Sequence, residues 1–232
     1  MRPSGRSLTD ATDPTDLPVP RLALLPAFLL FEAATGVLGA AYNRLVIGLP
    51  DLCDHVTRVG PVARAAAIGA VVGLLLGIVP EPAGGGDRLS GRLLGGRLLG
   101  GDIPLIPVLA GYLVVRFLAG PLSYAARTPG GLFAPLPAVG ALWGVLVHAL
   151  APPLLPGGAA GAVPFAIVGM AALFASVVRA PVTGIVLVVE MTGATSPLIP
   201  LMTACFAATP TPDRMGSTPI HDSLRPRTVW RD

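Results

Sequence analysis

The sequence predicts an all-helical protein that crosses a membrane several times. Two observations predict this class. Of its 232 residues, 53% are hydrophobic and only 12% are charged, about half the charge that soluble domains carry. From residue 128 to residue 178 the chain also contains no Asp, Glu, Lys or Arg. A membrane-spanning helix needs about 20 apolar residues, so this stretch alone can supply two. A soluble all-helical core is the less favoured alternative.

The ends of the chain differ in composition from its middle. Residues 1–20 are polar and rich in Ser, Thr, Asp and Pro, which predicts a disordered tail. No apolar segment directly follows Arg2 and Arg6, so this tail does not resemble a signal peptide. We expect a helical membrane domain over residues 21–209, followed by a short final helix and a C-terminal tail over residues 210–232.

Apolar stretches that end at polar residues, Gly or Pro predict the individual helices. These stretches cover residues 21–49, 65–79, 102–124, 136–150, 163–189 and 196–208. We expect residues 50–64 to form a polar connection. The stretch 163–189 should be two helices, because Pro181 cannot continue a helix and predicts a break at Arg179 and Ala180. Each piece is too short for a straight crossing, so tilted helices are expected.

Glycines spaced four residues apart predict close contact between helices in a membrane. Gly69, Gly73 and Gly77 fall on one face of the second predicted helix, and we expect this face to be a tight packing seam. Gly140 and Gly144 allow similar close packing in a later helix. Both seams are interpreted as structural, without chemistry of their own.

Two ionisable residues, Glu32 and Arg116, interrupt apolar stretches. An acid inside a membrane segment is a functional candidate by default. The alternative for Glu32, which we favour, is a structural acid near a helix end or paired with a neighbour. Arg116 is expected to extend toward the interface or to face a polar cavity.

Several function classes lack support in the sequence. The net charge of +3 is spread along the chain, without a basic patch that would indicate nucleic-acid binding. Cys53 and Cys205 lie far apart and show no metal-ligand spacing. Gly84–Gly86 is not followed by a lysine or preceded by a strand, so it does not indicate a phosphate-binding loop. No catalytic set of Ser, His and Asp is apparent. We expect no enzyme, metal or cofactor.

One glycine- and proline-rich turn lies inside the charge-free region and predicts the start of a helix. Gly130 and Gly131 free the backbone, and Pro135 suits a first helical turn, where no N–H is needed. The amides of Leu132 and Phe133 would then lie unpaired at a helix start, which attracts anions. Within a membrane, such a turn is typical of the wall of an ion site. The backbone of this anion motif comprises Gly130, Gly131, Leu132, Phe133, Ala134 and Pro135.

Three segments resemble one known family. Residues 130–135, GGLFAP, resemble the GGxFxP motif of the ClC chloride channels and chloride/proton exchangers. Residues 163–193 resemble the ClC run A-x-V-G-M-A-A, R-A-P-x-T-G-I and E-M-T-G, and residues 219–224 resemble P-I-Y-D-S-L. The resemblance covers residues 24–227. It implies the ClC fold of broken, tilted helices, with this chain as the second inverted repeat, the C-terminal half of a subunit about twice as long.

The resemblance also implies a chloride site. In ClC proteins the amides at the positions of Leu132 and Phe133 hold a central chloride. A tyrosine hydroxyl that helps to hold it is replaced here by His221, whose imidazole N–H can still donate to an anion. The alternative is that His221 is a tail residue without a site role. Glu190 suits a proton carrier by its place near a helix end, but the family implies a structural or dimer-side role.

Two family segments are absent from the sequence: the GSGIP-like loop that binds chloride and the GREGP-like loop that gates. The sequence therefore does not decide between a channel and an exchanger. The expected function is chloride transport by a truncated or partial subunit in a lipid bilayer, the bacterial inner membrane. Its expected partners are a second copy of the chain or a complementary N-terminal half. The alternative is a non-transporting remnant or an assembly partner of a split ClC transporter.

Overall fold

A computed structural model describes residues 25–55, 60–78, 106–126, 135–150, 162–193, 198–217 and 219–220. All regular secondary structure in these ranges is helical, as the sequence predicts. The helices are α1 (Leu25–His55), α2 (Pro61–Ile78), α5 (Ile106–Ala125), α6 (Pro135–Leu150), α7 (Ala162–Val178), α8 (Pro181–Thr192), α9 (Leu198–Ala208) and α10 (Pro210–Arg214).

The helices differ in their capacity to cross a bilayer. Of those described, α5 is the one that is long and apolar enough to do so by length and composition, with a mean hydropathy of 1.6. By contrast, α6, α7 and α8 contain 16, 17 and 12 residues, fewer than the roughly 20 that a straight crossing needs. Short apolar helices of this kind fit the broken, tilted segments that the sequence predicts.

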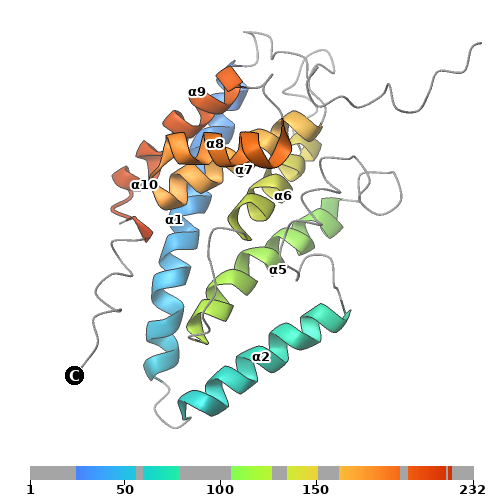
Figure 1. The fold of residues 1–232 in the computed structure, drawn as a ribbon, viewed down its shortest axis with the longest axis vertical. Helices are drawn as coiled ribbons and strands as arrows, with labels where there is room; N and C mark the ends of the chain where they lie inside the picture. The colour runs from blue at the N-terminus through green and yellow to red at the C-terminus, as the bar shows by residue number, and fades with distance from the viewer. Residues whose placement is uncertain are drawn as a thin grey trace, which may run out of the picture.

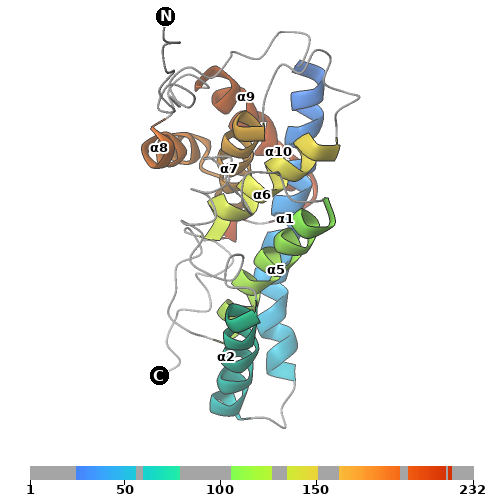
Figure 2. The same cartoon turned by 90° about the vertical axis from the view of Figure 1, so that its right-hand side faces the viewer.

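The core of the fold is α7. Every residue from Pro164 to Val177 is buried, and α6, α8, α9 and α1 surround the helix (Figures 1 and 2). A helix that is apolar on all sides keeps its side chains away from water only inside a packed core or in lipid. The absence of charge in this part of the sequence therefore reflects burial between other helices.

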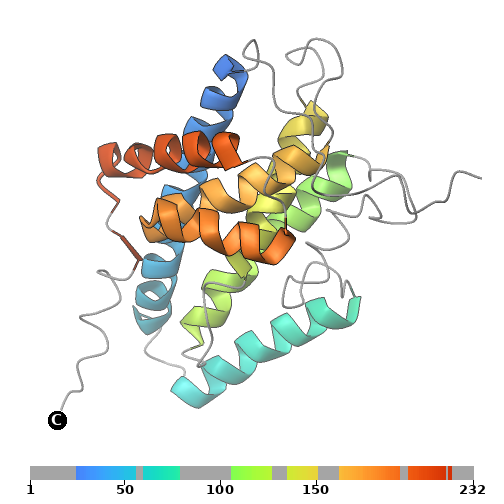
Figure 3. The ribbon, with the colours of Figure 1, turned by 45° about the horizontal axis from the view of Figure 1, so that its top comes forward.

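The remaining helices extend the core along one direction. α1 is the longest element and passes behind α7 and α8, and α5 packs against both α1 and α6 (Figure 1). α2 lies at the far end from α9 and packs beside α5 (Figures 1 and 2). α8 and α7 run side by side after the break, and α9 crosses near the first half of α1 (Figure 3).

The prediction that the first helix ends at residue 49 is wrong. α1 continues to His55 with Pro50 buried inside it, and the expected polar connection 50–64 shrinks to the few residues before α2. Pro50 removes one helical hydrogen bond. However, the guanidinium of Arg64 in α2 donates to the carbonyl oxygen of Cys53 at 2.9 Å and caps the last turn. This contact between α2 and α1 outweighs the tendency of Pro50 to end the helix.

The prediction of a packed glycine seam on α2 is also wrong. Gly69, Gly73 and Gly77 are exposed, and a Cβ atom on any of them would have no described atom within 4 Å. Val71 and Leu74, elsewhere on the circumference of α2, are also exposed. Glycine spacing shows that a helix can be approached closely, but it does not show which helix is approached.

The seam that is packed lies between α6 and α7. A Cβ atom on Gly140 would lie 2.7 Å from the Cα atom of Met170, and one on Gly144 would lie 2.6 Å from the carbonyl carbon of Phe165. Gly169 on α7 faces the backbone of Gly140 in the same way. The two backbones are thus in direct contact, as the prediction for Gly140 and Gly144 requires. This contact fixes the position of α6, and with it the end of the anion motif.

Candidate functional site

The predicted anion motif ends where α6 begins. Pro135 is the first residue of α6, as predicted, and Leu136 to Gly140 are all buried against the core. Gly130 to Ala134 lie outside the described residues, as does His221, so the predicted chloride ligands themselves are not placed. Ile220, which precedes His221, is buried. The helix start that the motif predicts is therefore present, and it lies in the interior.

A helix start in the interior has an electrostatic consequence. The first N–H groups of a helix have no intrahelical partner and carry a partial positive charge. Because the first turn of α6 is buried, this charge is directed into a low-dielectric region, where it acts more strongly than in water. The glycine contact with α7 holds the first turn in place, so the partial positive charge at the helix start has a fixed position.

The break between α7 and α8 is held by the side chain of Arg179. α7 ends at Val178, Arg179 adopts a positive φ of 63°, and α8 starts at Pro181. This confirms the predicted break. A non-glycine residue rarely adopts this conformation, so the surrounding contacts must stabilise it.

Those contacts come from the guanidinium group. Its Nε donates to the carbonyl oxygen of Ser176 at 2.9 Å, and its Nη2 donates to that of Ser217 at 2.8 Å. Its Nη1 reaches the carbonyl oxygen of Thr209 at 3.4 Å and forms an ion pair with Asp213. Arg179 therefore ties the α7–α8 break to the α9–α10 junction and to the segment that leads toward His221.

α1 contacts the same junction from the other side. The side-chain amide of Asn43 donates to the carbonyl oxygen of Val177 at 3.2 Å, and Arg44 donates to that of Met215 at 2.9 Å. Asn43 is buried in the middle of α1. An adjacent polar pair within an apolar stretch was the available signal that these residues hold backbone rather than face water.

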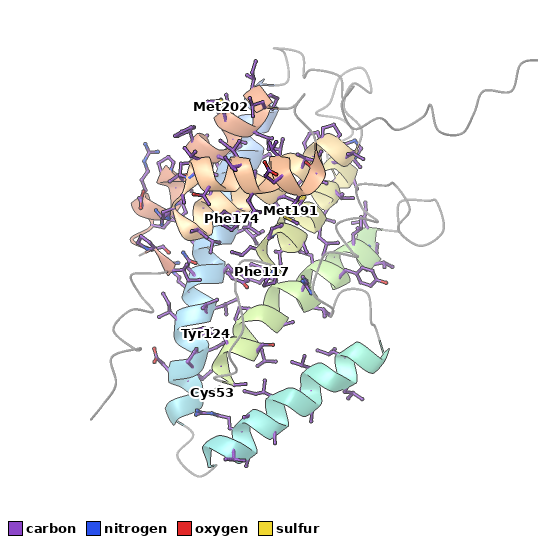
Figure 4. The ribbon with its side chains drawn as sticks, in the orientation of Figure 1. Cys53, Phe117, Tyr124, Phe174, Met191 and Met202 are labelled. Carbon is purple, nitrogen blue, oxygen red and sulfur yellow. The ribbon has the colours of Figure 1, made fainter. Side chains whose placement is uncertain are left out.

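Two charged residues are buried within the described part of the chain. Glu32 on α1 is 1% exposed and Arg116 on α5 is 4% exposed. Arg116 does not extend to the surface, the first of its two expected placements, and its charge lies close to Tyr42 of α1. Tyr42 in turn packs edge-on against Phe117, which lies between α5 and α1 in Figure 4, with ring centroids 5.3 Å apart.

The two acids named as candidates, Glu190 and Glu32, lie in different environments. Glu190 is exposed on α8, which does not favour the proton-carrier alternative. Glu32 lies well inside α1, and within the described part of the chain its Oε2 has no hydrogen-bond partner. Of the favoured alternative, an acid near a helix end or paired with a neighbour, no ion-pair partner is found among the described residues. Among the described residues no group of three His, Cys, Asp or Glu could hold a metal ion.

These features agree with a match to a known family. The family described as voltage gated chloride channel matches residues 8–213. This chain belongs to that family, the ClC family. The H(+)/Cl(-) exchange transporter ClcA of Vibrio parahaemolyticus is 37% identical over 216 residues, which are 92% of this chain and 45% of the relative. This chain thus spans about half the length of the curated relatives it matches.

Solved ClC structures share the fold. A slow cyanobacterial Cl⁻/H⁺ antiporter superposes with a TM-score of 0.73 at 29% identity and covers 90% of this chain and 48% of its own. A eukaryotic CLC transporter gives a TM-score of 0.70 at 24% identity, with coverage of 89% and 35%. The predicted family and the all-helical membrane fold are confirmed. The relatives are transporters, which fits the expectation that the chain is not an enzyme.

Proposed function

We propose that this ClC chain forms one half of a transmembrane anion pathway and supplies chloride ligands to it. The ligands are the backbone amides of Leu132 and Phe133, with His221 as a side-chain donor. The observation that carries this proposal is the start of α6 at Pro135, where the helix is buried from Leu136 onward. The amides that precede it in sequence would point their hydrogen atoms toward an interior site.

The composition around the motif supports an anion as the ligand. From residue 128 to residue 178 there is no carboxylate that would repel an anion and no cationic side chain that would pair with it. A desolvated chloride would instead be held by fixed backbone dipoles, which act strongly in a low dielectric. The similar ClcA and the cyanobacterial antiporter both exchange chloride against protons by name, so we propose anion/proton exchange in a bacterial inner membrane.

A second half must complete the pathway. In transporters built from repeats, midplane sites form between two repeats, and the curated relatives are about twice as long as this chain. We propose a second copy of the chain or a complementary N-terminal half as the source. The outer faces of α8 and α9 carry exposed apolar side chains for a dimer contact, including Met191 and Met202 (Figure 4).

Chloride efflux from liposomes tests the proposal. The chain is reconstituted alone and together with the N-terminal half of the Vibrio parahaemolyticus relative. Phe133→Pro removes one amide donor, whereas the matched control Phe133→Ala keeps the amide and removes only the ring. A hydrogen bond to a charged group is worth about 1.5–3 kcal/mol, so the Pro variant should lose about tenfold or more in chloride affinity.

The expected result is efflux above that of empty liposomes in at least one reconstitution, with loss in Phe133→Pro and retention in Phe133→Ala. No efflux from either reconstitution of inserted, folded protein contradicts the transport proposal. Equal efflux from the Pro and Ala variants contradicts the role of the amide while leaving transport intact.

His221 gives the site an expected pH dependence. An imidazole gains a positive charge between about pH 8 and pH 5, which strengthens its bond to an anion. Chloride binding by the wild-type protein should therefore tighten as the pH falls through this range, and His221→Tyr should remove this part of the dependence while keeping a donor. Chloride titrations at pH 5 and pH 8 measure the difference. An identical pH dependence in the two proteins means that His221 lies outside the site.

A further inference from the structure

Glu32 of α1 has an environment unlike that of the other described acids. Asp51, Glu190 and Asp213 are exposed, whereas Glu32 is 1% exposed. Its Oε2 has no hydrogen-bond partner, and no basic side chain of the described chain forms an ion pair with it. Glu32 is also absent from any motif that the proposed chloride site uses.

The polar groups nearest in α1 are already engaged. The hydroxyl of Thr35 donates to the carbonyl oxygen of Phe31 at 2.7 Å, and it accepts the indole N–H of Trp143 at 2.9 Å. The ring of Phe31 stacks on Trp143 with centroids 6.5 Å apart and meets Phe165 edge-on at 5.7 Å. One side of this turn is therefore an aromatic cluster that provides no counter-charge for Glu32.

The titratable group that faces Glu32 is Cys205 of α9. Cys205 is fully buried and close enough for the charge of Glu32 to act on its thiol. The other helices packed against α1 direct their titratable groups elsewhere. Arg116 of α5 lies by Tyr42, about 15 Å further along α1 at 1.5 Å per residue. Arg179, at the end of α7, pairs with Asp213 of α10.

None of the other described titratable groups forms an ion pair with the acid. His148 of α6 packs on the ring of Phe165, with centroids 5.4 Å apart. Arg214 of α10 is exposed. Within the described part of the chain, Cys205 is therefore the titratable group coupled to Glu32, and it carries no positive charge.

A carboxylate in such surroundings is unstable as an ion. Desolvation without a counter-charge costs several kcal/mol, and a buried acid avoids this cost by binding a proton. We propose that Glu32 is a proton-binding site between α1 and α9. The carboxylate takes one proton from water when the helices are packed and returns it to water when they separate. The inference does not depend on chloride binding by the α6 motif.

α9 is the element that such a change would move. It has 11 residues, and its buried side chains Leu201, Ala204, Cys205 and Ala208 form one face. The opposite face is exposed, with Ile199, Met202 and Phe206. An ionised Glu32 would place an unpaired charge under this single buried face. Admission of water between α1 and α9 then becomes favourable, which couples the proton to the packing of α9.

The thermal stability of the whole chain in detergent tests the site as a function of pH. A proton bound at Glu32 in the folded state would make stability fall as the pH rises beyond the range in which an exposed glutamate ionises. We expect the Tm of the wild-type protein to fall by about 5 °C or more over this rise. Glu32→Gln, which cannot ionise, should lack this fall. Glu190→Gln, at an exposed acid on α8, should retain it.

An infrared measurement on the wild-type protein detects the protonated carboxyl group directly, so it does not depend on whether a variant folds. At neutral pH the exposed acids are carboxylates, so the wild-type protein should show the C=O stretch of a neutral carboxylic acid that disappears at high pH. The Gln variant, where it folds, should lack this band. Absence of the band from the wild-type protein at neutral pH overturns the proposal, and so does an identical dependence of Tm on pH in wild type and Glu32→Gln. Neither result bears on chloride efflux, so the two proposals fail separately.

Discussion

Replacing Gly144 by Val is expected to destabilise the protein more than any other single change considered for the core. A Cβ atom at this position would lie 2.6 Å from the carbonyl carbon of Phe165 and 3.0 Å from the Cα atom of Ala166. Both are backbone atoms of α7, which is buried on all sides, so neither can move without displacing a whole helix. Overpacking of a core costs about 1–3 kcal/mol and sometimes more, and we expect at least about 3 kcal/mol here.

Gly69→Val provides the matched control. Gly69 lies in a helix and in a row of glycines four residues apart, as Gly144 does. Gly69 is exposed, however, and a Cβ atom on it would meet nothing described within 4 Å. Its replacement should change stability by less than about 1 kcal/mol, since Val has a slightly better helix propensity than Gly. Thermal unfolding and size-exclusion profiles in detergent measure both variants. Equal losses for the two would mean that α2 is packed against another chain in the assembled protein.

The second large effect is expected at the α7–α8 break, where Arg179→Met should cost about 3 kcal/mol or more. The change leaves the carbonyl oxygens of Ser176, Thr209 and Ser217 without the donor that now binds them. Hydrogen bonds to a charged group contribute about 1.5–3 kcal/mol each, although they do not add in full because they share one side chain. Methionine keeps an unbranched apolar side chain at this position and removes the whole guanidinium group with its donors.

Asp213→Asn separates the backbone contacts from the ion pair. The Asp213 side chain is 62% exposed, against 8% for Arg179, and exposed ion pairs contribute about 0–1 kcal/mol. We therefore expect this variant to lose less than about 1 kcal/mol in the same unfolding measurement. A loss as large as that of Arg179→Met would show that the ion pair, rather than the three carbonyl contacts, holds the break together.

These two sites explain how the fold supports the proposed pathway. Gly140, Gly144 and Gly169 fix the start of α6 against α7, and Arg179 fixes the C-terminal end of α7 against the segment that leads toward His221. The two parts of the proposed chloride site are far apart in sequence, and α7 lies between them in the chain. A central helix that is buried along its length keeps both at a constant separation, which a preorganised anion site requires.

The sequence by itself determined the class, the family and the helix breaks that follow from local chemistry. A long region without charge predicts helices that avoid water, and Pro181 ends α7 because a proline ring and a missing N–H act on their own turn. Pro135 predicts the start of α6 for the same reason. The residues Gly130 to Ala134 and His221, which lie outside the described part of the chain, remain predictions.

Tertiary structure decided the features that depend on which helices meet. Local rules favoured an end of α1 at Pro50, but Arg64 from α2 caps a longer helix. Two glycine seams looked alike in sequence, yet only the one on α6 is covered by another helix within the described structure. Periodicity records that a face is suited to contact, whereas burial of that face depends on the path of the rest of the chain. For the same reason, the burial of Glu32 without an ion-pair partner among the described residues became visible only in the tertiary structure.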